Sequence, residues 1–290
     1  PIRISRPLDF AAVTDHAEHL GQARLANLNV PTTQQSLNEL LRNGSLLKVT
    51  LAWLETSLQI RENGFSPGGV PPNRLVNLDA WQATIKAAED HNRPGIFTSF
   101  IGYEWSGDAG SITAHMHRNV IFRSNQVSEI PFSSIDSNRP EDLWQFLKEQ
   151  GEQGRVAMAI PHNANFSGGN MYAPKDSEGN PFSDEYAAMR SRYEPISEIL
   201  QIKGASETHP LLSSEDDFAG FEVIGESLFI GETTLETTKG SYARDALRVG
   251  MELGHSEGFN PFDFGVIGSS DSHNASSPSD EDNYTGKLPM

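Results

Sequence analysis

The chain has 290 residues, a formal charge of −17 at pH 7 and no cysteine. A length of this order fits one large α/β domain, so we expect a single domain over residues 1–290. The acidic balance would repel phosphate backbones, which argues against a nucleic-acid partner. The absence of cysteine excludes disulfides, thiolate zinc sites and cysteine nucleophiles. No stretch approaches about 18 apolar residues, so we expect no membrane span.

The compartment is indicated only indirectly. A cysteine-free chain is compatible with an oxidising environment. No signal peptide is visible, and the sequence starts at Pro1 without an initiator methionine, which is consistent with processing. We therefore expect a periplasmic or secreted location in preference to a cytoplasmic one.

Apolar and polar runs alternate along the N-terminal half. The first apolar run is expected to be a buried strand that leads into a polar loop. In chain order, the patterning predicts a strand over 8–14, helices over 36–59 and 79–91, and strands over 96–105 and 116–122.

The C-terminal half continues the alternation. The patterning predicts a helix over 140–150, strands over 156–160, 198–202 and 221–224, a helix over 242–253 and a strand over 264–267. Residues 163–195 are polar and rich in Gly, Asn, Ser and Pro, and we predict an irregular, lid-like segment there. The repeated order of strand, loop and helix favours parallel strands in an α/β sheet or barrel.

Imidazoles and carboxylates stand at or near the ends of several predicted strands, and α/β folds gather their ligands at strand ends. The residues in question are Asp15, His16, Glu104, His115, His117, His162, Asp271 and His273. His115 and His117 are two apart in a strand, so they point to the same face. Mixed nitrogen and oxygen ligands without sulfur suit Zn²⁺, Mn²⁺ or Fe²⁺, and we predict a site for two or three such cations.

Each of these residues also has an ordinary structural explanation. Asp15 could cap a helix, and Asp271 with His273 could be turn residues in a Ser-rich loop. A single histidine after a strand is commonly a hydrogen-bonded loop residue. The metal site is favoured because the ordinary explanation would have to hold independently at every strand end.

The same residues carry a family resemblance. The segments DFAAVTDHAE (9–18), GYEW (102–105), HRNV (117–120), PHN (161–163) and SDSHN (270–274) resemble motifs of the PHP (polymerase and histidinol phosphatase) superfamily, in the right order. QIKGASETHP (201–210) and SYARDAL (241–247) resemble its DUF3604 branch, and the resemblance covers nearly the whole chain.

This resemblance implies a distorted (β/α)₇ barrel with a trinuclear metal site. Glu104 would bridge two metals, with His117 and His162 on one of them, Asp271 on another, and His16 and His273 on the third. His117 is preferred over His115 because the family pattern is His-x-Asn-Val. Asp15 would orient a ligand without touching the metals. Glu207 and His209 would line the substrate pocket.

One family motif has no counterpart. The first motif, a His-x-His at the end of the first strand, should lie upstream of Asp9, where this sequence has no histidine. The last barrel elements would lie beyond Met290. We therefore expect the sequence to be a segment of a longer protein, with a barrel incomplete at both ends.

The function predicted from these residues is metal-dependent hydrolysis of a small-molecule phosphate ester, with a metal-bridging hydroxide as nucleophile. Glu104, Asp271 and Asp15 are the expected catalytic residues. Basic side chains available for the phosphate are Lys203, Arg118, Arg190 and Arg192.

Two other function classes remain open. The chain could bind a metal or ligand without turnover, as degenerate members of metal-hydrolase folds do. It could also be a serine hydrolase that uses Ser270 or Ser272, although it has no Gly-x-Ser-x-Gly motif. No Walker loop, dinucleotide fingerprint or EF-hand pattern is present, so nucleotide cofactors and structural calcium are not indicated.

Overall fold

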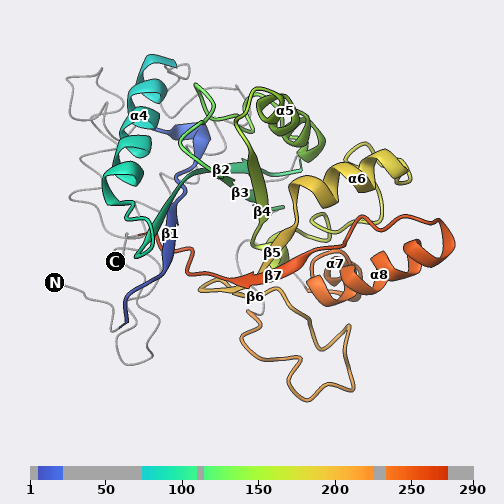
Figure 1. Cartoon of the computed structure of the whole chain (residues 1–290). Coiled ribbons are helices and arrows are strands. Elements are labelled where there is room, and N and C mark those ends of the chain that lie inside the picture. Colours follow the sequence, from blue (N-terminus) through green and yellow to red (C-terminus); the bar gives the residue numbers. More distant parts are fainter. Residues whose placement is uncertain (1–5, 22–73, 110–113, 225–232, 274–290) are drawn as a thin grey trace, which may run out of the picture.

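The computed structural model describes residues 6–21, 74–109, 114–224 and 233–273. Its larger sheet has four strands in the order β1-β2-β3-β4 (Figure 1). The strands are β1 (Phe10–Val13), β2 (Thr98–Gly107), β3 (Met116–Phe122) and β4 (Ala157–Pro161). β1 runs parallel to β2, whereas β3 runs antiparallel to both of its neighbours.

A smaller sheet of three strands lies beside β4. Its order is β6-β5-β7, with β5 (Ile196–Gln201), β6 (Gly204–Ala205) and β7 (Gly265–Gly268). β5 pairs antiparallel with β6 and parallel with β7. β5 also packs against β4, so the two sheets are neighbours.

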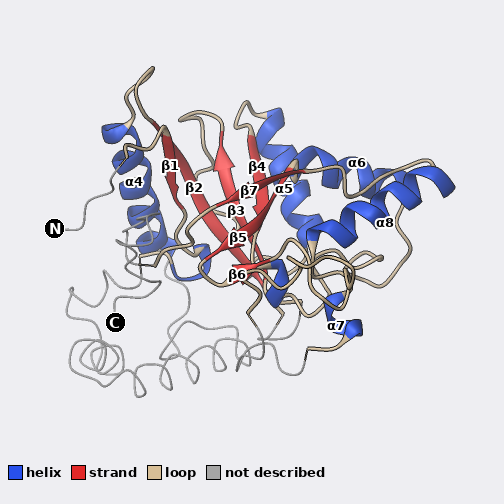
Figure 2. Ribbon diagram, turned by 90° about the horizontal axis from the view of Figure 1, so that it is seen from below, coloured by secondary structure: helices blue, strands red, loops and turns tan. Residues whose placement is uncertain are grey.

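Helices flank the sheets on two sides. They are α4 (Arg74–His91), α5 (Pro140–Glu152), α6 (Asp184–Tyr193), the short α7 (Leu235–Thr238) and α8 (Ala243–Ser256), with 3₁₀ turns η1 (Ala17–His19) and η2 (Ala164–Phe166). Figure 2 shows α4 beside β1 and β2, and α5, α6 and α8 at the other side, beyond β4. α5 begins with Pro140 and two acids in its first turn, where the backbone N–H groups are free.

Strand alternation separates the aromatic core from the polar face of β2. Tyr103 and Trp105 are buried on one face, and the ring of Tyr103 lies 5.8 Å from that of Trp81 on α4. Glu104 stands between them in sequence, so it points to the opposite face of the sheet. The hydrophobic packing of β2 against α4 therefore determines where this carboxylate goes.

A buried ion cluster anchors α6 to the same sheet. Arg118 Nε on β3 donates to Glu194 Oε1 at 2.8 Å, and the indole of Trp144 donates to the same oxygen at 2.8 Å. Arg190 on α6 approaches the other oxygen of Glu194 at 3.3 Å and donates to the carbonyl of Met171. Burial raises the pKa of Glu194, but the two guanidinium groups outweigh it and hold the pKa below its ordinary value.

The predicted (β/α)₇ barrel is wrong. The described strands form two small sheets with few helices and no closed barrel, and three of their pairings are antiparallel. The connection from β2 to β3, residues 108–115, is too short for a crossover helix, which requires an antiparallel return. The expectation of parallel strands holds only for the β1–β2 and β5–β7 pairs.

Most predicted elements are confirmed with small shifts of their ends, but four expectations need comment. The strand predicted over 221–224 is wrong, because residues 221–222 form a turn and residues 223–224 have no regular structure. The first strand exists but is not buried: Phe10 and Val13 are 55% and 64% exposed. The helix predicted over 36–59 lies outside the described residues. Residues 163–195 are not irregular throughout, because α6 occupies Asp184–Tyr193; their role as a cover stays a prediction.

No helix in the described ranges is both long enough and apolar enough to cross a lipid bilayer.

Candidate metal centre

Sheet register brings three side chains onto one face. In the β2–β3 pair, Ser106 lies opposite His117 and Glu104 lies two residues further along the same face. His162 directly follows β4, and its N–H donates to the carbonyl of His117. Glu104 is thus inside β2, within the strand predicted over 96–105, and the antiparallel pairing places the end of β4 at the start of β3.

The first strand and the second sheet supply the remaining residues. His16 follows β1 and forms an isolated parallel bridge with Glu104. Asp271 follows β7, at the end of the smaller sheet. Residues from five strand ends or strands therefore meet at one place, although their sequence positions span from 16 to 271.

Three imidazoles converge on one carboxylate oxygen. Glu104 Oε1 lies 2.6 Å from His117 Nδ1, 3.2 Å from His162 Nε2 and 3.6 Å from His16 Nδ1. Within the described part of the chain, this oxygen accepts no aligned hydrogen bond, and neither ring nitrogen of His162 makes one. His162 is only 1% exposed. Buried polar atoms nearly always have partners, so these orphaned lone pairs fit a cation held between them.

The candidate ligands form two groups that share Glu104. One is His16, Glu104 and His117; the other is Glu104, His162 and Asp271. Within each group, one ligand atom from each residue lies within 4.8 Å of the others. Imidazole with carboxylate is the donor set that Zn²⁺, Mn²⁺ and Fe²⁺ accept, so the residues present fit the predicted cations.

The protonation states also suit metal binding. Burial would raise the pKa of Glu104, but the nearby imidazoles hold it well below its ordinary value, so the carboxylate is ionised at neutral pH. Burial is the largest influence on His117 and lowers its pKa to about 4, although Glu104 acts in the opposite direction. A neutral imidazole with a free lone pair is the form that binds metals.

Asp271 is held by two neighbours from the β5–β6 turn. Its Oδ2 atom accepts a hydrogen bond from Gln201 Nε2 at 2.8 Å and contacts the ammonium group of Lys203. His273 bonds through Nδ1 to the carbonyl of Asp271 at 2.9 Å, and its ring lies 6.4 Å from that of His16. His273 is therefore adjacent to the centre but belongs to neither of the two ligand groups.

The side chains of three residues predicted to act at the centre or on the phosphate do not face the candidate metal centre. Asp15 meets the centre through its main chain, since its carbonyl accepts the N–H of Glu104, and its side chain is exposed. Arg118 follows His117 in β3, so it points to the opposite face and is fully buried against Glu194. Arg190 belongs to the same buried cluster, which leaves neither guanidinium facing the centre.

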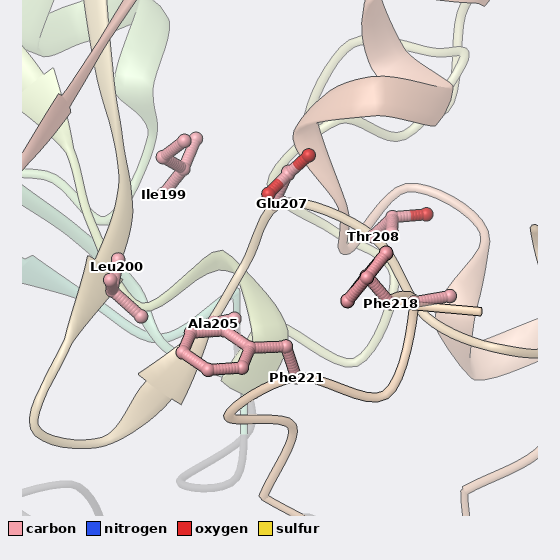
Figure 3. A pocket seen from close by; sticks show the side chains of 8 residues that line it. Ile199, Leu200, Ala205, Glu207, Thr208, Phe218 and Phe221 are labelled. Carbon is pink, nitrogen blue, oxygen red and sulfur yellow. The ribbon is translucent and has the colours of Figure 1, made fainter. Parts of the chain in front are cut away.

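The DUF3604-type motif around Glu207 lies at a separate pocket. Glu207 pairs with the exposed Arg244, and His209 packs against the ring of Tyr242. Figure 3 shows the side chains around this small, mainly apolar pocket. Its lining consists of Ile199, Leu200, Ala205, Glu207, Thr208, Phe218, Ala219 and Phe221, none of which is a candidate ligand.

The sequence analysis missed several polar residues at the centre. Ser106 Oγ bonds to His16 Nδ1, and Glu18 Oε1 accepts the N–H groups of Ser106 and Ser134 at 3.0 and 2.8 Å. Glu198 is buried on β5, where burial raises its pKa and Ser269 donates to it. Strand alternation could have identified Ser106, because residues two apart in a strand point to the same face and Ser106 is two residues after Glu104. Glu198 gave no signal except its position in a predicted strand, and Gln201 opened the DUF3604-like segment 201–210 without a role being assigned to it.

Comparison with known proteins gives one result. No curated protein and no solved structure matches the chain. A family model described as "Protein of unknown function (DUF3604)" matches residues 1–290. The motifs that carry the centre lie within the matched range, and the chain belongs to the DUF3604 family.

Proposed function

We propose that the chain is a metal-dependent hydrolase that acts on a phosphate ester of a small molecule. The observation that carries this proposal is the convergence of three imidazole nitrogens on one buried oxygen of Glu104, which accepts no aligned hydrogen bond from the described residues. A buried, ionised carboxylate oxygen that faces several imidazole nitrogens is a suitable partner for a divalent cation.

The charge at the centre supports an anionic substrate. The two candidate ligand groups contain two carboxylates, Glu104 and Asp271, and Lys203 already contacts one of them. Two divalent cations would therefore leave the centre with a net positive charge. A positive, partly buried cluster attracts a phosphoryl group far better than a neutral substrate.

Bound divalent cations would act as Lewis acids on a phosphoryl oxygen and lower the pKa of a water molecule. The chain's own residues would set the conditions for this chemistry. Glu104, ionised and shared by both ligand groups, would keep the two sites close together. His117, whose pKa is lowered by burial, would stay neutral, and both His117 and His162 would offer nitrogen atoms to the cations. Asp271 would be held in place by Gln201 and Lys203.

The resemblance of the motifs to the PHP superfamily is a second support, and we infer a relationship at the level of these motifs. The segments around His16, Glu104, His117, His162 and Asp271 supply both candidate ligand groups. The inference concerns the ligand set and does not extend to a closed barrel.

One observation favours a second candidate, a metal-binding module without turnover. Glu104 and His162 are 5% and 1% exposed, which suits a closed structural site as well as a catalytic one. His16 is more open, with its side chain 42% exposed, so a substrate would have to approach from its side.

The test combines metal analysis with an activity screen. The intact protein is loaded with Zn²⁺ or Mn²⁺, its metal content is measured, and hydrolysis of p-nitrophenyl phosphate and bis-p-nitrophenyl phosphate is followed. Two bound ions with hydrolysis that is lost in Glu104→Gln support the hydrolase. Bound ions without turnover of either ester support the binding module, and absence of bound ions contradicts both.

A further inference from the structure

The two loops that carry His162 and Asp271 share an unusual backbone conformation. Asn163, next to His162, has φ = 58°, and Asp271 itself has φ = 46°. Non-glycine residues rarely occupy this left-handed region, although Asn and Asp tolerate it better than most. Such conformations persist where surrounding contacts hold them, and they cluster at ligand sites.

One buried amide contacts both loops. Gln201 Nε2 donates to Asn163 Oδ1 and also to Asp271 Oδ2, the latter at 2.8 Å. The two N–H groups of the amide can thus serve one loop each. Gln201 Oε1 accepts the N–H of Lys203 at 2.6 Å, which determines which end of the amide faces the loops.

Sheet topology explains why Gln201 can reach both. It is the last residue of β5, which pairs parallel with β7, and the N–H of Ser269 continues this pairing by bonding to the carbonyl of Leu200. The Asp271 loop therefore begins beside the end of β5. β4, which leads into the His162 loop, also packs against β5. The C-terminal end of β5 therefore lies between the His162 loop and the Asp271 loop.

We propose that Gln201 is a positioning residue that joins the His162 loop to the Asp271 loop at the separation needed by the Glu104–His162–Asp271 group. This inference rests on the proposed function, because it assumes that the group binds a cation. Lys203 also contacts Asp271, but the amide of Gln201 is the group that joins the two loops. The other ligand group, His16–Glu104–His117, has no contact with Gln201 in this network.

The proposal is tested by metal titration of the intact protein with Co²⁺, followed by its visible spectrum, and with Zn²⁺ by calorimetry. Gln201→Glu has nearly the same shape and keeps an acceptor for the Lys203 N–H. It places a carboxylate oxygen against Asp271 Oδ2 and Asn163 Oδ1, where two hydrogen bonds are lost. The affinity for one of the two ions should fall about 10–100-fold, the usual effect of losing an outer partner of a metal ligand.

The affinity for the second ion distinguishes a local effect on one ligand group from a general loss of structure. The other ion should keep its affinity and its Co²⁺ spectrum in Gln201→Glu, whereas His117→Ala should produce the complementary loss. Gln82→Glu, on the exposed face of α4, is the matched control for the same chemical change and should bind both ions as the parent does. Gln201→Met removes the hydrogen bonds without adding charge and should show the same selective loss.

Different results overturn different statements. A parent protein that binds no ion contradicts the proposed function. Two ions in the parent with unchanged affinities in both Gln201 variants contradict the positioning role. Loss of both ions, or failure of both Gln201 variants to fold, also contradicts it, because Gln201 would then serve the structure as a whole and not one ligand group.

Discussion

Two buried carboxylates on opposite faces of one sheet have opposite electrostatic surroundings. Glu194 faces Arg118 and Arg190, whose guanidinium groups are charged at every accessible pH. Glu104 faces His16, His117 and His162, and His117 at least is neutral at pH 7 because burial lowers its pKa. The first carboxylate has permanent counter-charges from the chain itself, whereas the second has only imidazole partners.

Two adjacent residues of β3 contact the two different carboxylates. His117 and Arg118 are neighbours in β3 and point to opposite faces, so one serves Glu104 and the other Glu194. The ion pairs of Glu194 with Arg118 and Arg190 hold α6 on the sheet. A carboxylate whose partners are imidazoles instead fits the metal centre that we propose. Variants on the two faces should therefore separate stability from metal binding.

The largest effect is expected at Glu194. Glu194→Gln keeps the shape but leaves two buried guanidinium groups without a counter-charge, which should lower the free energy of unfolding by about 3–5 kcal/mol. Urea denaturation of the metal-free protein measures this change, and Glu185→Gln, exposed on α6, is the control. A metal affinity that falls together with stability would show that the two faces are not independent.

Glu104→Gln should have the opposite profile. The amide cannot supply charge to two ligand groups, so metal affinity and turnover should fall by more than the roughly 10–100-fold typical of an outer partner. Metal content and ester hydrolysis measure the effect, with Glu149→Gln on the exposed face of α5 as the control. The metal-free protein should lose less stability than it does in Glu194→Gln, because imidazole partners can give up a proton whereas guanidinium groups cannot. Full metal content with undiminished turnover would contradict the shared-ligand assignment.

The pH dependence of stability sharpens the comparison further. Because Arg118 and Arg190 lower the pKa of Glu194 in the folded state despite burial, the unfolded chain binds the proton at higher pH. The stabilisation is fully present above the unfolded value of about 4.3 and is lost as pH falls toward the folded pKa. Thermal unfolding of the metal-free protein from pH 6 downward should show this loss, and Glu194→Gln should flatten the profile. An unchanged slope in the variant would exclude Glu194 as its source.

The smallest effect is expected at His115. Its ring stacks on that of His117 with centroids 4.7 Å apart, and burial lowers its pKa to about 2, so it is a neutral neighbour outside both ligand groups. His115→Ala should reduce metal affinity and turnover by less than about tenfold, through a less ordered His117 ring. His115→Phe, which keeps a flat ring, should restore part of the loss. A metal-free His115→Ala protein would show that His115, not His117, is the ligand.

Local sequence patterns were sufficient for much of this protein. Period-2 alternation and Gly or Pro punctuation located β2, β3 and β4, and the proline and acids at 140–142 marked the start of α5, because these signals depend only on neighbouring residues. The ligand types were also readable, since His16, Glu104, His117, His162 and Asp271 each stand in or next to a recognisable strand. The same alternation, applied to Arg118, would have removed it from the substrate-binding residues.

Tertiary structure alone decided how these pieces assemble. The sequence indicates strands but not their partners, and the antiparallel return of β3 replaces the expected barrel because the β2–β3 connection is short. No local pattern indicates what Gln201 and Glu194 do, although Gln201 stands in the DUF3604-like segment, because their roles depend on contacts with residues 38 to 76 positions away. The sequence therefore determined which groups were available for a metal. Only the packing of two sheets and α6 decided which of the buried carboxylates, Glu104 or Glu194, was left without a permanent counter-charge.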